Sequence, residues 1–122
     1  MKRVIICGSR DWTDQVTIGT FILGLRAMHP NLTVVHGNAR GADKLAQQFC
    51  LASGIPEEPH PADWVGHGKG AGPIRNREML ESGAFLVVAF KDGFDRTLQR
   101  GGTENMIRIA TEAGVRTVVV SH

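Results

Sequence analysis

The sequence predicts an α/β fold, a Rossmann-like three-layer sandwich of about five mainly parallel strands with helices on both faces. Short apolar runs rich in β-branched residues alternate with stretches whose apolar residues recur at helical spacing. Glycine-bearing turns separate them, in the repeated order strand, turn, helix that is typical of parallel sheets. The length of 122 residues and the 42% hydrophobic content fit one domain over residues 1–122.

In chain order, residues 3–7 form a continuous apolar run, which is typical of a strand that is buried on both faces of a parallel sheet. Apolar residues then recur at helical spacing over residues 14–28, and Thr13 or Asp14 can cap this helix. The short apolar run at residues 32–36 predicts the second strand.

The second helix is expected to begin near Ala42 and to end at Gly54, which suits a left-handed cap. Residues 55–60 predict a third strand, and the prolines within and beside it place that strand at a sheet edge. Residues 63–72 are rich in glycine and predict a mobile loop. We expect residues 66–72 to form a lid over a site and to be the least ordered internal segment.

The remaining elements follow the same alternation. Pro73 suits the first turn of a helix that ends near Ser82. The chain then continues with a buried strand at residues 85–90, a polar loop at 91–100, a helix at 103–113 that Gly114 caps, and a last strand at 116–120.

Composition and charge exclude several classes of protein. The 14 basic and 12 acidic residues give a net charge of +2, which is too small for a dedicated nucleic-acid binder. Cys7 and Cys50 lie in apolar or helical patterns and are expected to pack as small hydrophobes, as suits a cytoplasmic protein. No apolar run approaches the roughly 20 residues that cross a bilayer, and no signal peptide is recognisable. The histidines show no metal-ligand spacing, so we expect no metal and no cofactor.

The glycine stretch at Gly101 and Gly102 is expected to hold a phosphate, because it precedes a helix and follows a strand. The first N–H groups of a helix lack intrahelical partners, and the helix dipole leaves partial positive charge there. Thr103 is the expected N-cap and can add a hydroxyl to the same anion. An ordinary loop with a helix cap would show the same short motif.

Two further glycine turns, at residues 8–12 and 37–41, are expected at the same edge of the sheet. In a parallel α/β sheet the loops after the strands meet at the carboxyl edge, where such folds bind ligands. The helix that carries Arg75, Asn76 and Arg77 joins them there. Three weak motifs at one edge reinforce one another and favour a phosphate-bearing ligand.

An ordered set of motifs resembles the SLOG superfamily, in particular its small stand-alone YspA-like members from bacteria and their phages. The motifs span nearly the whole chain and lie at residues 8–10, 36–43, 61–64, 72–79 and 101–106. The resemblance implies a Rossmann-like fold that binds nucleotides or nucleotide-derived ligands. The superfamily also contains LOG enzymes, which hydrolyse the N-glycosidic bond of nucleoside monophosphates, and DprA-like proteins, which bind single-stranded DNA.

The resemblance to the LOG enzymes is incomplete at their catalytic positions. In those enzymes an arginine before the helix and a glutamate three places after the threonine serve the chemistry. Arg75 matches the arginine, whereas Met106 stands at the glutamate position. Glu104 lies two places earlier, and on a helix that displacement turns its side chain well away. The resemblance therefore favours a binding protein over a phosphoribohydrolase of this mechanism.

The candidate ligand residues are those of the three turns and the arginine helix. They are Gly8, Ser9, Arg10, Trp12, Gly37, Arg40, Gly41, Asp43, Arg75, Asn76, Arg77, Gly101, Gly102, Thr103 and Glu104. The arginines can fork onto a phosphate, or else form surface salt bridges. Asp43 most simply orders its loop, and the alternative is contact with a ribose hydroxyl. Trp12 and Trp64 can stack on a base or pack against the domain.

We therefore expect a cytoplasmic protein that binds a nucleotide-derived ligand, as a sensor or by sequestering it, and that forms a homo-oligomer. One alternative is a hydrolase or transferase acting on the glycosidic or phosphate bond of a nucleotide, with Arg75, Glu104, Asp43 or Asp11 in the chemistry. Another is a single-stranded DNA-binding protein, although we find no basic stripe interleaved with aromatic residues.

Overall fold

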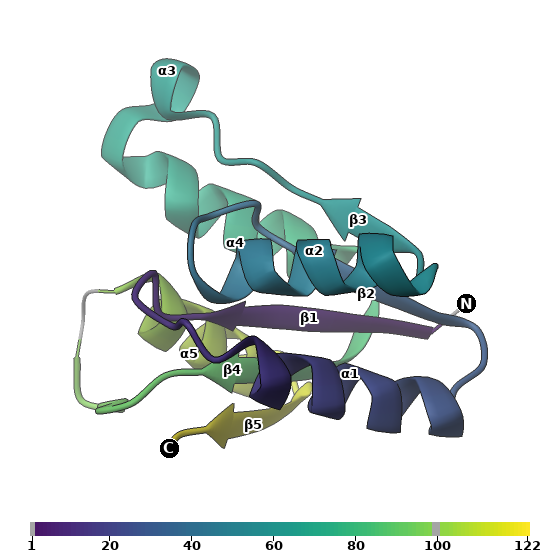
Figure 1. Ribbon diagram of the computed structural model, residues 1–122. Helices are drawn as coiled ribbons and strands as arrows, with labels where there is room; N and C mark the ends of the chain where they lie inside the picture. The colour runs from purple at the N-terminus through teal and green to yellow at the C-terminus, as the bar shows by residue number, and fades with distance from the viewer. Residues whose placement is uncertain (1, 99–100) are drawn as a thin grey trace.

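The computed structural model describes residues 2–98 and 101–122. Its strands are β1 (Lys2–Gly8), β2 (Leu32–His36), β3 (Glu57–Pro59), β4 (Ala84–Phe90) and β5 (Arg116–Val120). They form one parallel sheet in the order β3-β2-β1-β4-β5 (Figure 1). The predicted five-stranded α/β fold is confirmed.

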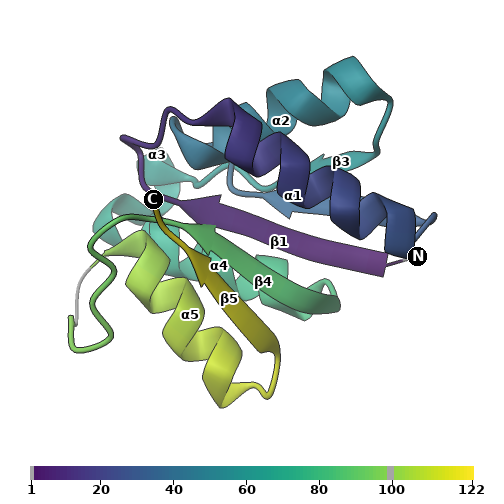
Figure 2. The ribbon, with the colours of Figure 1, turned by 60° about the horizontal axis from the view of Figure 1, so that its bottom comes forward.

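The helices cover both faces of this sheet, as Figure 2 shows. They are α1 (Gln15–Met28), α2 (Ala42–Ser53), α3 (Trp64–His67), the 3-10 helix η1 (Gly68–Gly70), α4 (Ala71–Glu81) and α5 (Gly102–Glu112). On one face Ile18 of α1 and Ala46 of α2 pack on β1, and on the other face Met79 of α4 and Met106 of α5 do so. The predicted three layers are therefore present.

The central strands read as continuous apolar runs because they are covered on both sides. Val4, Ile5 and Ile6 of β1 are fully buried, and successive side chains enter opposite core clusters. Burial of one such side chain contributes about 1.5–3 kcal/mol to folding. The layers therefore hold β1, and the turn that follows it, in a fixed position.

Two predicted helix ends are confirmed. Asp14 is the N-cap of α1, and its Oδ1 accepts a hydrogen bond from the Thr17 N–H at 3.1 Å. Gly54 ends α2 in the left-handed conformation. The third strand is confirmed as an edge strand but covers only residues 57–59, because the prolines on either side limit its backbone pairing.

The prediction of a loop over residues 63–72 is wrong, because this segment is mostly helical. Asp63 caps α3, accepting at Oδ1 from the Gly66 N–H at 2.8 Å, and η1 then leads directly into α4. The Asp63 side chain thus satisfies a backbone N–H group at the start of the helix, which the glycine-rich composition alone did not indicate. The low order expected for residues 66–72 stays a prediction.

Two residues of the expected polar loop at 91–100 lie outside the described part of the chain, namely 99 and 100. Among the described residues, no helix combines the length and the apolar character needed to cross a bilayer. The same residues contain no group of three or more His, Cys, Asp or Glu side chains arranged to hold a metal ion.

Candidate functional site

The sheet order creates a crevice between the carboxyl ends of β1 and β4. From β1 the chain builds outward through β2 to β3, and it then returns to the other side of β1 to form β4 and β5. Gly8 and Phe90 are register partners where the two central strands end. Open α/β sheets bind ligands at this kind of reversal point.

A cavity of about 290 Å³ occupies this crevice, and we call it the first cavity. More than half of the predicted ligand residues line it, from the first and third glycine turns, the start of α2 and α4. They are Gly8, Ser9, Arg10, Asp43, Arg75, Asn76, Gly102 and Thr103. Segments distant in the sequence therefore converge as predicted.

Glycines let the first two turns pack closely against the sheet and against each other. A Cβ at Gly8 would overlap the carbonyl oxygen of Phe90, and the Ser9 N–H donates to that oxygen at 2.9 Å. A Cβ at Gly41, whose φ is +81°, would overlap the carbonyl oxygen of Ser9. Gly41 thus lies behind the cavity, where it positions the turn rather than facing a ligand.

The third turn presents the N-terminus of α5 to the first cavity. Gly101 is the N-cap of this helix, and its carbonyl oxygen accepts from the Asn105 N–H at 2.9 Å. Thr103 was predicted as the N-cap but lies in the first turn, where it lines the cavity. The free N–H groups of a first turn and the helix dipole both favour an anion at this place.

Arg75 on α4 reaches across to the second turn. Its Nη1 donates to the Gly37 carbonyl oxygen and its Nε to Asn76 Oδ1 at 3.2 Å. A side chain at position 37 would overlap the guanidinium group, so glycine makes room for Arg75 there. The buried Asn76 donates from Nδ2 to the Gly102 carbonyl oxygen at 3.2 Å, which ties α4 to the start of α5.

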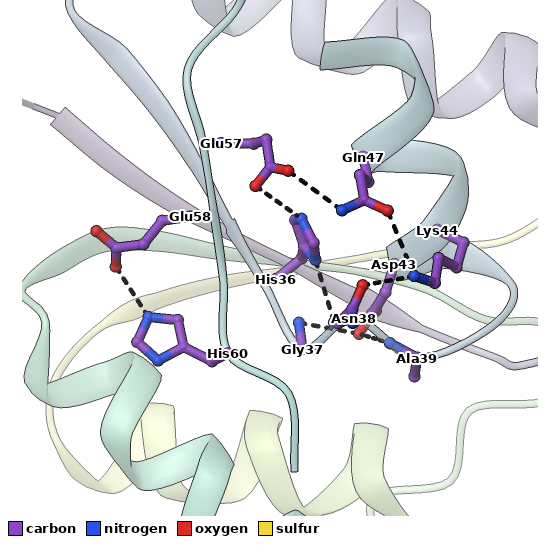
Figure 3. A network of polar contacts seen from close by, with 10 residues as sticks. All are labelled: His36, Gly37, Asn38, Ala39, Asp43, Lys44, Gln47, Glu57, Glu58 and His60. Atoms are coloured by element: carbon purple, nitrogen blue, oxygen red, sulfur yellow. Dashed lines mark hydrogen bonds and ion pairs between the residues drawn. The ribbon is translucent and has the colours of Figure 1, made fainter. Parts of the chain in front are cut away.

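Asp43 orders the second turn from inside the protein (Figure 3). Its Oδ2 accepts from the N–H groups of Gly37 at 3.0 Å and Ala39 at 3.4 Å. Burial raises the pKa of this carboxyl group to about 6, although the two N–H groups and the charge of Arg75 act in the opposite direction. Asp43 therefore shapes the loop and also presents a titratable group to the first cavity.

Glu104 was predicted as a ligand residue, but its side chain pairs with Lys91 and does not line the first cavity. Its side chain is 2% exposed, and its carboxylate accepts from Lys91 Nζ at 2.6 and 2.8 Å. Lys91 itself lines the cavity. Because Glu104 follows Thr103 by one position, the helix turns its side chain away from the cavity and toward the end of β4.

Trp12 packs in the core instead of offering its ring to a base. It is 4% exposed, and its ring centroid lies 5.6 Å from that of Phe90. On its other side it stacks on His122 at 4.3 Å, and its Nε1 donates to the Asp14 carbonyl oxygen at 3.0 Å. The prediction of Trp12 as a ligand residue is therefore wrong.

The other arginines differ in their placement. Arg10 lines the first cavity, whereas Arg77 is exposed outside it, since two positions along α4 turn it away from Arg75. Arg40 lies outside the lining of the first cavity, and its Nη2 is 3.7 Å from Oδ1 of Asp11. Both of those groups are largely exposed, so their ion pair contributes little to stability.

The sequence reasoning missed Lys91, Ala39, Met79 and Cys7 as lining residues of the first cavity. Lys91 had a usable signal, because it directly follows the apolar run of a central strand and so lies at the carboxyl edge. Burial raises the pKa of the Cys7 thiol, which keeps it protonated and poorly nucleophilic.

A second cavity of about 460 Å³ adjoins the first. The two share Arg10, Ala39 and Arg75. The loop at residues 37–40 forms one wall of the second cavity, and Trp64, which is 50% exposed, is part of another. The two cavities therefore lie side by side at the carboxyl edge, and we call them together the groove.

Comparison with known proteins agrees with this architecture. The DNA processing protein A (DprA) of Streptococcus pneumoniae has a similar fold, with a TM-score of 0.74 and 19% identity. The match covers 98% of this chain and 50% of that one, so this chain spans half the length of DprA. At this identity the likeness shows the fold alone.

Sequence comparison gives the family. The Gene 61 protein of Mycobacterium phage D29 is 39% identical over 121 residues, covering 94% of this chain and 93% of the phage protein. The family model described as the YspA, cpYpsA-related SLOG family matches residues 2–67, which include the first two glycine turns and their strands. The resemblance identified from the motifs is confirmed: the chain belongs to the YspA, cpYpsA-related SLOG family.

Proposed function

We propose that this protein binds a nucleotide or nucleotide-derived ligand through its phosphate at the carboxyl edge of the sheet. The observation that carries the proposal is the convergence of a helix N-terminus with three cationic side chains on the first cavity. Gly102 and Thr103 of α5 line it together with Arg10, Arg75 and Lys91. Backbone N–H groups and arginine forks are the usual ligands of phosphate in proteins.

The charges around the first cavity support an anionic ligand. Asp43 is the carboxylate among its lining residues, and it already accepts two backbone hydrogen bonds. Lys91 is paired with Glu104, so the remaining charged groups are the two cations Arg10 and Arg75 and the one carboxylate Asp43, an excess of one positive charge when Asp43 is ionised. This excess and the helix N-terminus together favour a phosphate group.

The candidate catalytic groups support binding rather than turnover, as a sensor or a sequestering protein would require. Glu104 is paired with Lys91, and Arg75 is held by Gly37 and Asn76. A general acid or base must reach the reacting atoms, and Glu104 lies outside the lining of the first cavity.

A hydrolase acting on nucleotides is the second candidate, and Asp43 is the observation that favours it. Its carboxyl group lines the first cavity, and burial raises its pKa to about 6. A carboxyl group that titrates near neutral pH is suited to general acid or base catalysis. Such an enzyme would use Asp43 beside the phosphate-binding groups.

Calorimetric titration with a panel of nucleotides, followed by chromatography of the recovered ligand, tests the proposal. Binding predicts one ligand per site, recovered unchanged from the complex. Repeated turnover that disappears in Asp43→Asn would instead establish the hydrolase. A protein that bound none of the nucleotides and no simple sugar phosphate would contradict both functions.

A further inference from the structure

The second cavity gives the proposed ligand a place to extend beyond its phosphate. The first cavity, at about 290 Å³, lies at the lower limit of the roughly 300–1,000 Å³ that small-molecule sites occupy. The second, at about 460 Å³, continues from it past Arg10 and Arg75. The second cavity is therefore the adjoining space into which the distal part of a ligand with its phosphate at α5 can extend.

Trp64 is the aromatic side chain in the lining of this second cavity. It is the first residue of α3, whose start is fixed by the Asp63 cap. The far end of the indole lies beside α4, where a Cβ built at Gly72 would be 3.6 Å from its Cη2. The residue is nevertheless 50% exposed. A large aromatic surface that is held in place and left uncovered suits stacking of a planar group.

The loop at residues 37–40, another part of this lining, is polar and is ordered from behind (Figure 3). Asp43 binds the N–H groups of Gly37 and Ala39, and Lys44 Nζ donates to Asn38 Oδ1 at 2.6 Å. The Asn38 N–H in turn donates to Nδ1 of the buried His36 at 3.1 Å. These contacts order the loop before a ligand binds. They use the N–H groups of residues 37–39 and the Asn38 Oδ1, so the side-chain group that the loop offers to a ligand is the Asn38 Nδ2, which donates to no atom of the described residues.

Building on the proposed phosphate site, we propose that the second cavity binds a nucleobase, which stacks on Trp64 while its edge faces the loop at residues 37–40. A base has an aromatic face and a hydrogen-bonding edge, and the two walls of this cavity offer one partner for each. The proposal places the base of the nucleotide ligand in the second cavity and assigns a side chain that recognises it. Trp64 is the residue that determines this specificity.

The test compares ribose 5-phosphate with the four common ribonucleoside 5′-monophosphates by calorimetry. The variants are Trp64→Ala, Trp64→Phe and the control Val65→Ala, which alters the adjacent, fully exposed residue of α3. The parent should bind at least one nucleotide more tightly than ribose 5-phosphate. Trp64→Ala should reduce that preference roughly tenfold or more, since base stacking on an aromatic ring has about this value.

The remaining measurements separate the nucleobase subsite from the phosphate site. Ribose 5-phosphate affinity should be unchanged in Trp64→Ala, and Trp64→Phe should keep most of the nucleotide preference. If Trp64→Ala kept the full preference, or if the parent bound ribose 5-phosphate as tightly as every nucleotide, the subsite would be refuted while phosphate binding stood. A parent that bound neither class of probe would overturn the phosphate site and the subsite together.

Discussion

Lys91 and Glu104 form an ion pair between the end of β4 and the first turn of α5, with Lys91 Nζ 2.6 Å from Oε2 of Glu104. Glu104 is 2% exposed at its side chain, whereas Lys91 is 24% exposed and lines the first cavity. The pair thus places a cation beside the proposed phosphate and at the same time compensates a buried carboxylate.

Replacing Lys91 and replacing Glu104 should therefore lower the free energy of unfolding by different amounts. Lys91→Met leaves Glu104 buried without its cation and should lower the free energy of unfolding by about 3 kcal/mol. Glu104→Gln removes the buried charge itself, while Lys91 can still reach solvent, so its cost should be smaller. Urea unfolding of both variants measures the difference. Equal losses would show that the pair contributes little beyond packing.

The raised pKa of Asp43 predicts a specific dependence of stability on pH. A carboxyl group with a folded pKa of about 6 and an ordinary pKa of 3.8 binds its proton more tightly when the protein is folded. Its contribution is therefore fully present below pH 4 and is lost as the pH rises to 6, by about 3 kcal/mol in total.

Comparison with Asp43→Asn isolates this contribution, because other carboxyl groups such as Asp14 and Glu58 have lowered pKa values and act in the opposite direction. The stability of the parent minus that of the variant should fall between pH 4 and pH 6. A difference that stayed constant over this range would mean that Asp43 titrates normally in the folded protein.

The segment at residues 66–72, which was predicted to form a lid, should exchange its amide hydrogens rapidly. Residues 66–72 span the end of α3, η1 and the start of α4, and glycines at several of these positions carry a large backbone entropy. Hydrogen exchange should be faster there than in β1 and β4, and it should slow when a nucleotide binds. Protection equal to that of the central strands without ligand would contradict the expectation.

A homo-oligomer is also predicted, since a domain with one thin sheet leaves apolar helix surface to cover. The exposed apolar side chains Val16, Leu23 and Met28 of α1 are consistent with this expectation. Sedimentation velocity at micromolar concentration should show a species larger than the 13.2 kDa chain. A single monomeric species would remove the prediction.

The fold could be predicted because burial on both faces leaves a simple pattern in each central strand. Val4 to Cys7 and Leu86 to Phe90 are apolar without interruption, and the helices around them begin and end at recognisable residues such as Asp14 and Gly54. The topology then brings the glycine turns to one edge, so a large part of the first cavity followed from the sequence.

The roles of individual side chains depend on contacts that local patterns do not contain. Trp12 follows a glycine turn, yet Phe90 and His122 enclose it from distant parts of the chain. Glu104 lies outside the lining of the cavity and pairs with Lys91, which directly follows β4. Residues 64–70 are helical, and their first turn is capped by the side chain of Asp63. The prediction gave more weight to the glycine content of the segment than to this one capping residue.

The central claim is that the N-terminus of α5 binds a phosphate, and Gly102→Asp tests it most directly. Apart from the adjacent residues and the backbone of α5 itself, no atom of the described residues lies within 4 Å of a Cβ built at Gly102, and an aspartate is favourable at a helix N-terminus. The variant should therefore fold. Its carboxylate would occupy the phosphate position and repel the ligand where little water screens the charges.

Calorimetric titration should compare the parent, Gly102→Asp and the control Gly24→Asp, using a nucleotide that binds the parent. Gly24 lies on α1 with equally open space around its Cβ, far from the groove, so this control adds the same charge elsewhere. We predict that Gly102→Asp weakens binding at least about a hundredfold while Gly24→Asp leaves it unchanged. Parental affinity in a folded Gly102→Asp protein would contradict the account, because the glycine turn would then be only a turn.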